Sequence, residues 1–529
     1  MKRAMELKEW NFQIPEFGFE KRVSLPYTWN VEDEMQIQLY RGQAEYTTEV
    51  ELDEKTYARA VLYFGCVFHT ARVFVNGIPA GGHTGSGYTP FELDITAFVT
   101  QGKNQIRVIA DNSRKEEMLP HGLDYDWADD GGLLRDVWLT LTEKDDILQM
   151  ETGYSIESIR EQTCSGCLRL HIKGSPIKAQ VQVIEYKTGY AVLSQSVCTG
   201  EWAEVHFEGF KLWEPEHPNL YVVQVRTGQD EIEERIGFRT IEVKGAGVYL
   251  NGKRLFMKGC EWMPGSHPDY GMAEPFEHSV KCLTQLKQAG CIFTRFHWQQ
   301  DRKILDWCDE NGLMVQEEIP FWGQPKRAGE EQLILAKHQA EEMVHFHGSH
   351  PSIICWGVGN ELGGELPETI DYVKKMYRYF KELDGSRLVN YVSNTVSRDA
   401  NVKLDDAAMY GDIAMWNEYL GLWQPCEDVE GVIRRTYEKF GNMPSMVTEF
   451  GLCEPAFEGG DERRAQILRE RIPVYKSLDH MAGYVWFSLN DYRTHYGEYG
   501  EGKMKQRIHG STDLYGNEKP SYKVLCDIS

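Results

Sequence analysis

Up to about residue 240, short runs of the chain alternate apolar and polar positions, which is the pattern of half-buried β-strands. The runs at 58–64 and 71–75 end at turn-forming residues, Gly65 and the pair Asn76-Gly77. A second β-rich stretch, 145–242, has about the 100 residues of an immunoglobulin-like sandwich. The longer stretch before it predicts a larger sandwich of the jelly-roll type.

After residue 243, short apolar runs alternate with amphipathic helical patterns such as 370–383. Eight of the apolar runs predict buried strands: 255–259, 291–297, 313–319, 353–359, 388–392, 413–416, 445–448 and 483–489. Repeated strand and helix units predict a (β/α)8 barrel, whose active site lies at the carboxyl ends of its strands. We therefore expect three domains: a jelly-roll domain at 1–143, an immunoglobulin-like β-sandwich at 144–242 and a (β/α)8 TIM barrel at 243–529.

Composition argues against several classes of function. The chain has 57 Lys and Arg against 81 Asp and Glu, a formal net charge of −24, which opposes binding to nucleic acid and to anionic membranes. No apolar run approaches the roughly 20 residues of a membrane-spanning helix, and the first nine residues show no secretory signal. The 12 cysteines are dilute and mostly lie in apolar runs, which predicts reduced thiols and a cytoplasmic protein.

The carboxyl ends of the predicted barrel strands are rich in carboxylates. The residues at or just after these ends are His297, Glu317, Glu318, Asn360, Glu361, Asn417, Glu418, Tyr419, Glu449 and Trp486. None of them is a Ser or Cys nucleophile with a neighbouring His. Two carboxylates with separated pKa values are what cleavage of a glycosidic bond needs, one as the acid and one as the nucleophile or base.

Neither a cofactor nor a metal ion is expected. The stretch 357–363 resembles a dinucleotide-binding loop, but Leu362 stands where that loop needs its third glycine. A histidine cluster precedes the fourth strand and so belongs to the end of the barrel opposite the active site, where an ordinary structural role is expected. Its members are His345, His347 and His350.

Four segments resemble glycoside hydrolase family 2. Residues 356–361, Trp-Gly-Val-Gly-Asn-Glu, resemble its acid/base motif, and residues 447–451, Val-Thr-Glu-Phe-Gly, its nucleophile motif. Residues 416–423 resemble the Asn-x-Tyr-x-Gly-x-aromatic segment of the glucuronidase branch. Residues 126–135 resemble the loop that the family's sugar-binding domain sends to the barrel mouth. The resemblance covers nearly the whole chain and implies the same domain order.

The resemblance implies a role for each matching residue. Glu361 would be the general acid and then the base, and Glu449 the nucleophile of a retaining mechanism, with carboxyl groups about 5 to 5.5 Å apart. Asn360 would hold the sugar 2-hydroxyl, and Tyr419 would orient Glu449. The other implied substrate contacts are His297, Asn417 and Trp423 on the pocket wall, Asp126 at hydroxyls on the far side of the ring, and Trp486 as the floor. Glu317 and Glu318 are expected to pair inside the barrel mouth.

The chain departs from the family at the substrate carboxylate. β-Glucuronidases usually carry an Asn-x-Lys pair after the last strand, and here the corresponding stretch, 503–510, lacks it. Lys505 and Arg507 are the candidates to bind a carboxylate in its place, with Lys503 and Arg493 nearby. The alternative is that these cations pair with Glu498, Glu501 and the acidic 124–130 loop.

Three functions stay open on the sequence. We expect a retaining exo-β-glycosidase without a cofactor, most of all a β-hexuronidase that favours galacturonide over glucuronide. A β-galactosidase is the alternative, because Asp129 and Asp130 beside Asp126 would repel a uronate. A non-catalytic carbohydrate-binding protein is the second alternative. The expected partner is a small or oligomeric β-glycoside, neither nucleic acid nor membrane, and the family resemblance implies a homo-oligomer.

Overall fold

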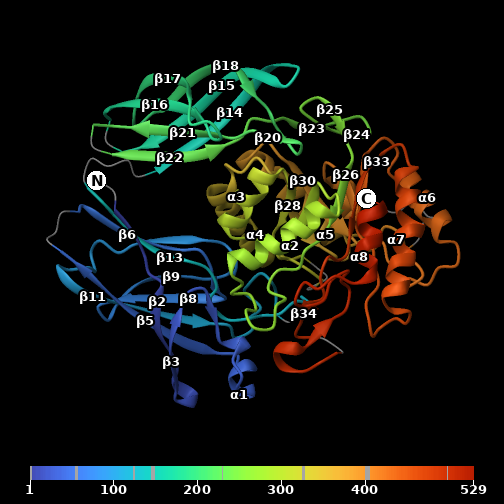
Figure 1. Ribbon diagram of the computed structural model, residues 1–529, viewed down its shortest axis with the longest axis horizontal. Coiled ribbons are helices and arrows are strands. Elements are labelled where there is room, and N and C mark those ends of the chain that lie inside the picture. The colour runs from blue at the N-terminus through green and yellow to red at the C-terminus, as the bar shows by residue number, and fades with distance from the viewer. Residues whose placement is uncertain are drawn as a thin grey trace.

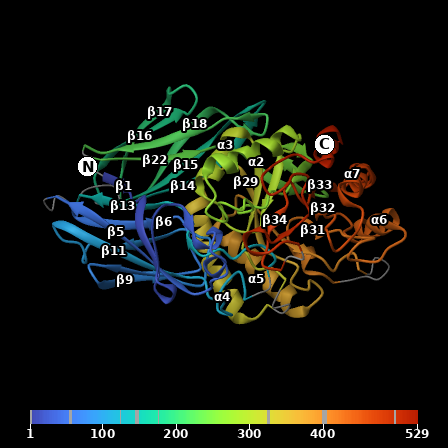
Figure 2. The same cartoon turned by 60° about the horizontal axis from the view of Figure 1, so that its bottom comes forward.

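The computed structural model describes residues 3–53, 57–122, 125–143, 149–174, 176–228, 230–323, 328–398, 405–496 and 499–528. Within them, two β-sandwiches and a barrel follow one another along the chain, and both sandwiches flank the barrel (Figures 1 and 2). The predicted fold class is confirmed. No helix among the described residues has the length and apolarity needed to cross a membrane.

The first sandwich is built from antiparallel strands. One sheet has the order β1-β13-β6-β10 (Arg3–Glu6, Val137–Thr142, Arg59–Phe64, Phe91–Asp94). The facing sheet has the order β3-β2-β5-β11-β8-β9 (Phe19–Ser24, Glu9–Ile14, Gln43–Leu52, Gly102–Asp111, Thr70–Val75, Ile78–His83). A third, short sheet has the order β4-β12-β7 (Tyr27–Thr28, Gly132–Leu133, Val67–Phe68). Alternate residues of β5 and β6 are buried, so the predicted alternation marks the core face.

The second sandwich packs two smaller antiparallel sheets. Their orders are β14-β15-β18 (Gln149–Arg160, Thr163–Lys173, Trp202–Lys211) and β17-β16-β21-β22 (Ala191–Cys198, Lys178–Glu185, Tyr221–Arg226, Glu231–Ile236). A short sheet, β23-β24-β25 (Ile241–Lys244, Gly247–Leu250, Lys253–Leu255), connects it to the barrel. Trp213 and Val248 belong to the same buried cluster as barrel residues such as Met257 and Phe293, so these segments close the amino end of the barrel.

Eight strands close the barrel. They are β26 (Met257–Cys260), β27 (Phe293–Phe296), β28 (Met314–Glu318), β29 (Ile353–Asn360), β30 (Leu388–Ser393), β31 (Ala414–Asn417), β32 (Ser445–Glu449) and β33 (Met481–Trp486). Each overlaps a predicted run, and the largest shift is of β33, which begins two residues and ends three residues earlier than the predicted run.

The barrel helices are α2 (Phe276–Gln288), α3 (Arg302–Asn311), α4 (Glu330–His347), α5 (Pro367–Leu383), α6 (Val429–Lys439), α7 (Gly460–Lys476) and α8 (Pro520–Ile528). Local signals set their ends: the Asp301 side chain caps the start of α3, and Gly312, at φ +63°, ends it. In its described part, the connection from β30 to β31 carries only the short 3-10 helix η3 (Ala407–Tyr410). The connection from β30 to β31 can therefore contribute residues to the barrel mouth.

A two-stranded ribbon follows the last barrel strand. It consists of β34 (Tyr492–Arg493) and β35 (Gln506–Arg507), and its register sets Tyr492 opposite Arg507. This ribbon and the 125–130 loop of the first sandwich meet at the carboxyl end of the barrel, where Tyr492 and Arg507 both donate to Asp126.

Candidate active site

A cavity of about 410 Å³ opens at the carboxyl end of the barrel. Most of the expected site residues line it: Asp126, His297, Glu361, Asn417, Tyr419, Trp423, Glu449 and Arg507. Its volume falls in the roughly 300–1,000 Å³ range of pockets that enclose drug-sized ligands. The remaining wall residues follow barrel strands or belong to β34, and no motif singles them out: Trp322, Asn394, Arg398, Gln424, Phe487, Tyr492 and His509.

Glu361 lies directly after β29 in a left-handed backbone conformation, with φ +58°, which is uncommon for a residue with a side chain. Asn417 Nδ2 donates to its Oε1 at 2.7 Å. Burial and then the charge of Glu449 raise the pKa of Glu361 to about 7. Glu361 therefore holds a proton up to near neutral pH, as a general acid must.

Glu449 ends β32 and is held at both oxygens. Tyr419 Oη donates to Oε2 at 2.9 Å, and Arg295 Nη1 donates to Oε1 at 2.7 Å. A hydrogen bond on each oxygen, one of them from a cation, holds the carboxylate group in a fixed orientation. The expected role of Tyr419 in orienting Glu449 matches this geometry.

Arg295 is the central cation of the site and is fully buried. Its Nη2 donates to Asn360 Oδ1 at 2.8 Å and to Glu318 Oε2 at 3.0 Å, while its Nε donates to Glu318 Oε1. Burial favours the protonated form of Glu318, but the charge of Arg295 together with hydrogen bonds from His297 and Arg295 outweighs burial and lowers the pKa of Glu318 to about 2. Glu318 is therefore an anion that anchors Arg295, in agreement with the expected pairing.

Asn360 shares this network. Its Oδ1 also accepts from Asn417 Nδ2 at 3.2 Å, whereas its buried Nδ2 has no hydrogen-bond partner among the described residues. Asn360 is absent from the described wall of the cavity. Its unpartnered amide remains available as a donor, which fits the expected contact with a sugar hydroxyl.

Glu261 is a functional candidate that sequence reasoning missed. It lies one residue after β26, and its carboxylate is 3.2 Å from His297 Nε2 and 3.5 Å from Arg295 Nη1. Neither oxygen has a hydrogen-bond partner among the described residues. Burial, with smaller additions from the charges of Glu449 and Glu318, raises its pKa to about 8 against the attraction of His297 and Arg295. The predicted strand stopped at residue 259, two positions too early to include Glu261.

The adjacent glutamates of β28 point to opposite faces of the strand. Glu318 faces the barrel interior, whereas Glu317 accepts from the Gln300 backbone N–H at 2.9 Å and contacts His347 Nδ1 at 2.9 Å. The expectation that both pair inside the mouth is therefore correct only for Glu318. Glu418 is also outside the cavity, because Tyr475 and the Leu420 backbone donate to its carboxylate.

The acidic loop of the first sandwich delivers one carboxylate to the cavity. Asp126 Oδ2 accepts from Tyr492 Oη at 2.9 Å and from Arg507 Nη1 at 2.6 Å. The neighbouring Asp129 and Asp130 are each 1% exposed and turn away from the cavity. The loop therefore places only Asp126 on the described cavity wall.

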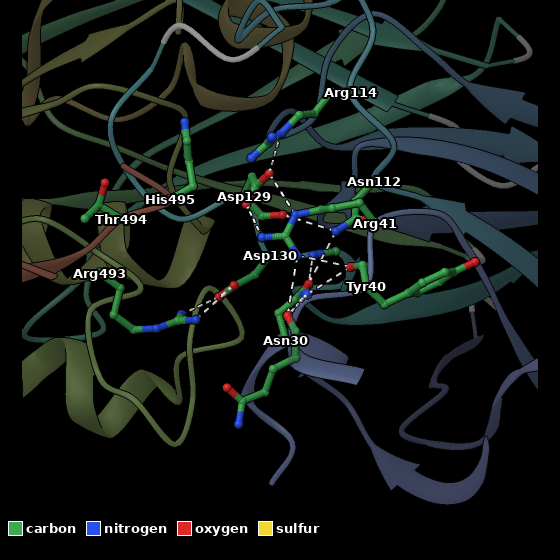
Figure 3. A network of polar contacts seen from close by, with 12 residues as sticks. Asn30, Tyr40, Arg41, Asn112, Arg114, Asp129, Asp130, Arg493, Thr494 and His495 are labelled. Carbon is green, nitrogen blue, oxygen red and sulfur yellow. Dashed lines mark hydrogen bonds and ion pairs between the residues drawn. The ribbon is translucent and has the colours of Figure 1, made fainter. Parts of the chain in front are cut away.

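Figure 3 shows how Asp129 and Asp130 are neutralised. Arg41 Nε donates to Asp129 Oδ2 at 2.9 Å, and Arg114 Nε donates to the same oxygen at 3.2 Å. Arg493 donates to both oxygens of Asp130, with Nη2 at 3.1 Å from Oδ1. The negative charge that argued for a neutral substrate is thus paired within the protein.

Of the basic stretch near the carboxyl terminus, Arg507 alone reaches the described wall of the cavity. Lys505 Nζ donates to the His495 carbonyl at 2.8 Å. The expectation that Lys505 contacts the substrate is therefore corrected. Lys503 pairs with Asp33 at 3.0 Å and Arg493 with Asp130. Arg493 and Arg507 follow the alternative, because they pair with Asp130 and Asp126 of the acidic loop, whereas Lys503 and Lys505 have other partners. Glu498 lies outside the described residues.

His509 joins Arg507 on this wall. The imidazole lies between Phe487 and Tyr492, with ring centroids at 5.0 and 5.7 Å. Burial, and then the charge of Arg507, lowers the pKa of His509 well below its usual value, so the ring is neutral. His509 Nδ1 and Arg507 Nε are buried and have no hydrogen-bond partner in the described structure.

One of the two expected tryptophans lies away from the cavity. Trp486 is fully buried, donates from Nε1 to Ser511 Oγ at 3.0 Å and is absent from the described wall, whereas its neighbour Phe487 lies on that wall. Trp423 lies on the wall as expected and is 50% exposed.

A group of possible metal ligands lies within the site. Ligand atoms of Glu261, His297 and Glu449 lie within 4.8 Å of one another. Arg295 contacts both glutamates and already supplies positive charge at this point. In the histidine cluster, His347 pairs with Glu317 and His350 with Asp309, at 2.9 and 2.6 Å.

Comparisons with known proteins agree on one family. Three domain models of glycosyl hydrolases family 2 match consecutive stretches: the sugar-binding domain at 8–142, the family 2 domain at 134–239 and the TIM barrel domain at 241–477. A Formosa agariphila protein assigned provisionally as a β-glucuronidase is 32% identical over 397 residues, 72% of this chain. That match spans about half of the relative, 47% of its length. A Thermoanaerobacterium thermosulfurigenes β-galactosidase is 28% identical over 96% of this chain and 73% of its own length.

Solved structures share the complete architecture. A β-galacturonidase from Eisenbergiella tayi, bound to galacturonate, has a TM-score of 0.84 and 26% identity, covering 100% of this chain and 97% of the other. A β-glucuronidase of an uncultured Clostridium has a TM-score of 0.88, covering 99% and 97%, and at 20% identity it shows the fold alone.

Proposed function

Because the chain belongs to glycoside hydrolase family 2, we propose that it is a retaining, exo-acting β-glycosidase that removes a terminal β-linked hexuronic acid. The observation that carries the catalytic part is the contrast between Glu361 and Glu449 in one cavity. Glu361 has a pKa raised to about 7, whereas Glu449 accepts hydrogen bonds from Arg295 and Tyr419. One carboxyl group is suited to give a proton and the other to attack.

The proposed reaction has two steps. The Glu449 carboxylate attacks the anomeric carbon, the glycosidic C–O bond breaks, and the Glu361 proton passes to the leaving oxygen. Bonding to the sugar removes the charge of Glu449, which is one of the causes of the raised pKa of Glu361. Glu361 then becomes a better proton acceptor for a water molecule, which attacks the anomeric carbon and releases Glu449 with retained configuration.

The uronide part rests on Arg507 and His509. Both side chains lie on the cavity wall, and each has a nitrogen without a hydrogen-bond partner among the described residues. Residues i and i+2 of an extended segment present their side chains to the same side. A substrate carboxylate would accept from the guanidinium, sharing it with Asp126, and from the neutral imidazole. The pairing of Asp129 and Asp130 removes the argument for a neutral galactoside. Similarity to the Eisenbergiella β-galacturonidase supports galacturonide as the preferred sugar.

A substrate panel tests this proposal. We expect the wild type to hydrolyse 4-nitrophenyl β-galacturonide and β-glucuronide much faster than the β-galactoside and β-mannoside. Glu449→Ala should abolish turnover. Arg507→Gln should lower kcat/KM for uronides about 100-fold, the size of a lost charge-assisted contact, with little effect on neutral glycosides.

Lys505→Gln is the matched control, because Lys505 lies on the same segment but bonds to the His495 carbonyl. Lys505→Gln should leave kcat/KM for all four glycosides unchanged. Turnover of the neutral glycosides alone would contradict the uronide proposal, and unchanged hydrolysis by Glu449→Ala would contradict the nucleophile.

We also propose that the enzyme is cytoplasmic and homo-oligomeric. The 12 cysteines all lie in the described structure as thiols outside disulfide bonds, and most are buried, which suits a reducing compartment. Cell fractionation and light scattering of the purified protein test the two statements separately.

A further inference from the structure

The cavity continues past Glu361 to a rim built by two loops. Asn394 and Arg398 follow β30, and Trp423 follows β31. The loops are tied together: Gln424 Nε2 donates to the Asn394 carbonyl at 3.2 Å, and Ser397 Oγ donates to Gln424 Oε1 at 2.9 Å. The rim is therefore a preformed surface.

The rim lies on the side of the cavity where the leaving group of the substrate is expected. Glu361 follows β29, whose neighbour in the barrel is β30 and then β31. The proposed acid protonates the oxygen of the group that leaves, so that group must lie on the Glu361 side of the cavity. Arg507 and His509, the proposed contacts to the sugar carboxylate, come from β35 and the segment after it, which do not belong to these loops.

Three side chains of the rim have complementary chemistry. The Trp423 indole is 50% exposed, and Phe457 supports it edge-on at 4.5 Å and 79°, so a broad apolar surface is held in place. The Asn394 Oδ1 atom is buried and has no hydrogen-bond partner among the described residues. The Arg398 side chain is 53% exposed, and its ion pair in the described structure is a long one, 3.9 Å to Glu365.

We propose that Trp423, Asn394 and Arg398 form a leaving-group subsite for a second, acidic sugar. The natural substrate is then an acidic oligosaccharide with a β-linked hexuronic acid at its non-reducing end. The ring of the second sugar packs on Trp423, one of its hydroxyls donates to Asn394 Oδ1, and its anionic group pairs with Arg398. A plain aryl group offers neither the hydroxyl nor the charge. The inference rests on the proposed function and extends it to the leaving group.

The test compares substrates that share the hexuronide and differ in what leaves. They are 4-nitrophenyl β-hexuronide, a β-hexuronide linked to a neutral hexose, and a β-linked hexuronic acid disaccharide. We expect Trp423→Ala and Asn394→Ala to lower kcat/KM about tenfold for both disaccharides, and by much less for the aryl substrate. Arg398→Gln should lower kcat/KM several-fold for the acidic disaccharide alone. Added salt should reduce the preference of the wild type for the acidic over the neutral disaccharide.

Two control variants match these changes. Trp202→Ala removes an indole of similar exposure, 52%, from the second sandwich, and Arg226→Gln removes from the same domain a guanidinium side chain that is 52% exposed, close to the 53% of Arg398. Both should leave the ratio of disaccharide to aryl hydrolysis unchanged. Rim variants that lower kcat/KM equally for all three substrates would overturn the subsite, and an Arg398→Gln effect equal for neutral and acidic disaccharides would overturn its acidic specificity. A wild type that cleaves none of the hexuronides would overturn the proposed function itself.

Discussion

Glu361 and Glu449 have the same side chain, and their neighbours place them in different environments. Glu361 is buried beside another carboxylate, and its one charge-stabilising hydrogen bond comes from a neutral amide, that of Asn417. Glu449 contacts the guanidinium of Arg295 and a phenol. Burial is the main cause of the raised pKa of Glu361, whereas ionic hydrogen bonding holds Glu449. The proposed acid and the proposed nucleophile are distinguished by contacts within a few ångströms.

The raised pKa of Glu361 predicts the alkaline limit of activity. Since the acid must be protonated, kcat/KM should fall as the pH rises through about 7. Asn417→Ala removes a hydrogen bond that lowers this pKa, so the limit should move to higher pH by up to about one unit. A pH profile of kcat/KM on the aryl hexuronide measures the shift. A limit that stays in place or moves to lower pH would contradict the assignment of Glu361.

Glu261 predicts a pH-dependent stability. Its pKa rises from an ordinary 4.5 to about 8 on folding, so the folded state keeps a proton that the unfolded chain releases between these values. The stabilising contribution of this proton is complete below pH 4.5 and is lost as the pH rises through 8. Glu261→Gln resembles the protonated acid at every pH. Its unfolding free energy should therefore exceed that of the wild type by on the order of 1–2 kcal/mol at pH 8, and by much less at pH 5.

Denaturant unfolding of the wild type and of Glu261→Gln at pH 5 and pH 8 measures this difference in free energy. A difference that shrinks with rising pH would show that Glu261 is ionised in the folded protein.

At the scale of elements, strand β29, which carries the acid/base motif, must leave space for the Glu318 side chain of the adjacent strand β28. A Cβ atom on Gly357 would lie 2.2 Å from Cγ of Glu318, its register partner on the adjacent strand β28. The glycine in the acid/base motif therefore preserves the Glu318 position on which Arg295 depends. The ribbon of β34 and β35 acts similarly outside the barrel, since its pairing sets Tyr492 beside Arg507.

Gly357→Ala should lower both stability and activity. The added methyl group displaces Glu318, so we expect a loss of about 1–3 kcal/mol in unfolding free energy together with a lower kcat/KM. Gly385→Ala is the control, because its added Cβ would come no closer than 3.6 Å to the nearest atom that it meets. Denaturant melts and aryl hexuronide kinetics of the two variants measure the effect. Equal behaviour would refute the packing argument.

At the scale of the whole molecule, the site requires the first sandwich. Trp127 stacks on His297 and on Trp298 of the barrel, with ring centroids at 5.6 and 4.6 Å. Asp130 of the same loop pairs with Arg493, which lies near the carboxyl terminus (Figure 3). The net charge of −24 therefore does not describe the cavity, because cations neutralise the acids of this loop where the domains meet.

Asp130→Asn should weaken the contact between the domains. Asp130 and Arg493 are 1% and 6% exposed, so loss of the anion leaves a buried cation unpaired at a cost of about 3–5 kcal/mol. Asp33→Asn should have almost no effect, because Asp33 is 98% exposed where it pairs with Lys503. Thermal unfolding and proteolysis of the 125–130 loop compare the variants. The double variant with Arg493→Gln should cost less than the sum of the single changes, and strict additivity would exclude the coupling.

The sequence by itself determined the domain order, the eight barrel strands and the presence of Glu361 and Glu449 at strand ends. These features depend on periodicity and on short motifs, which are local properties of the chain. Only the tertiary structure decided which charges face the substrate. It pairs Asp129 and Asp130 internally, turns Lys505 to a carbonyl, buries Trp486 and leaves Arg507 on the wall. The physical reason is that a charge is set by its neighbours in space, and Arg507 lies 381 residues from its partner Asp126.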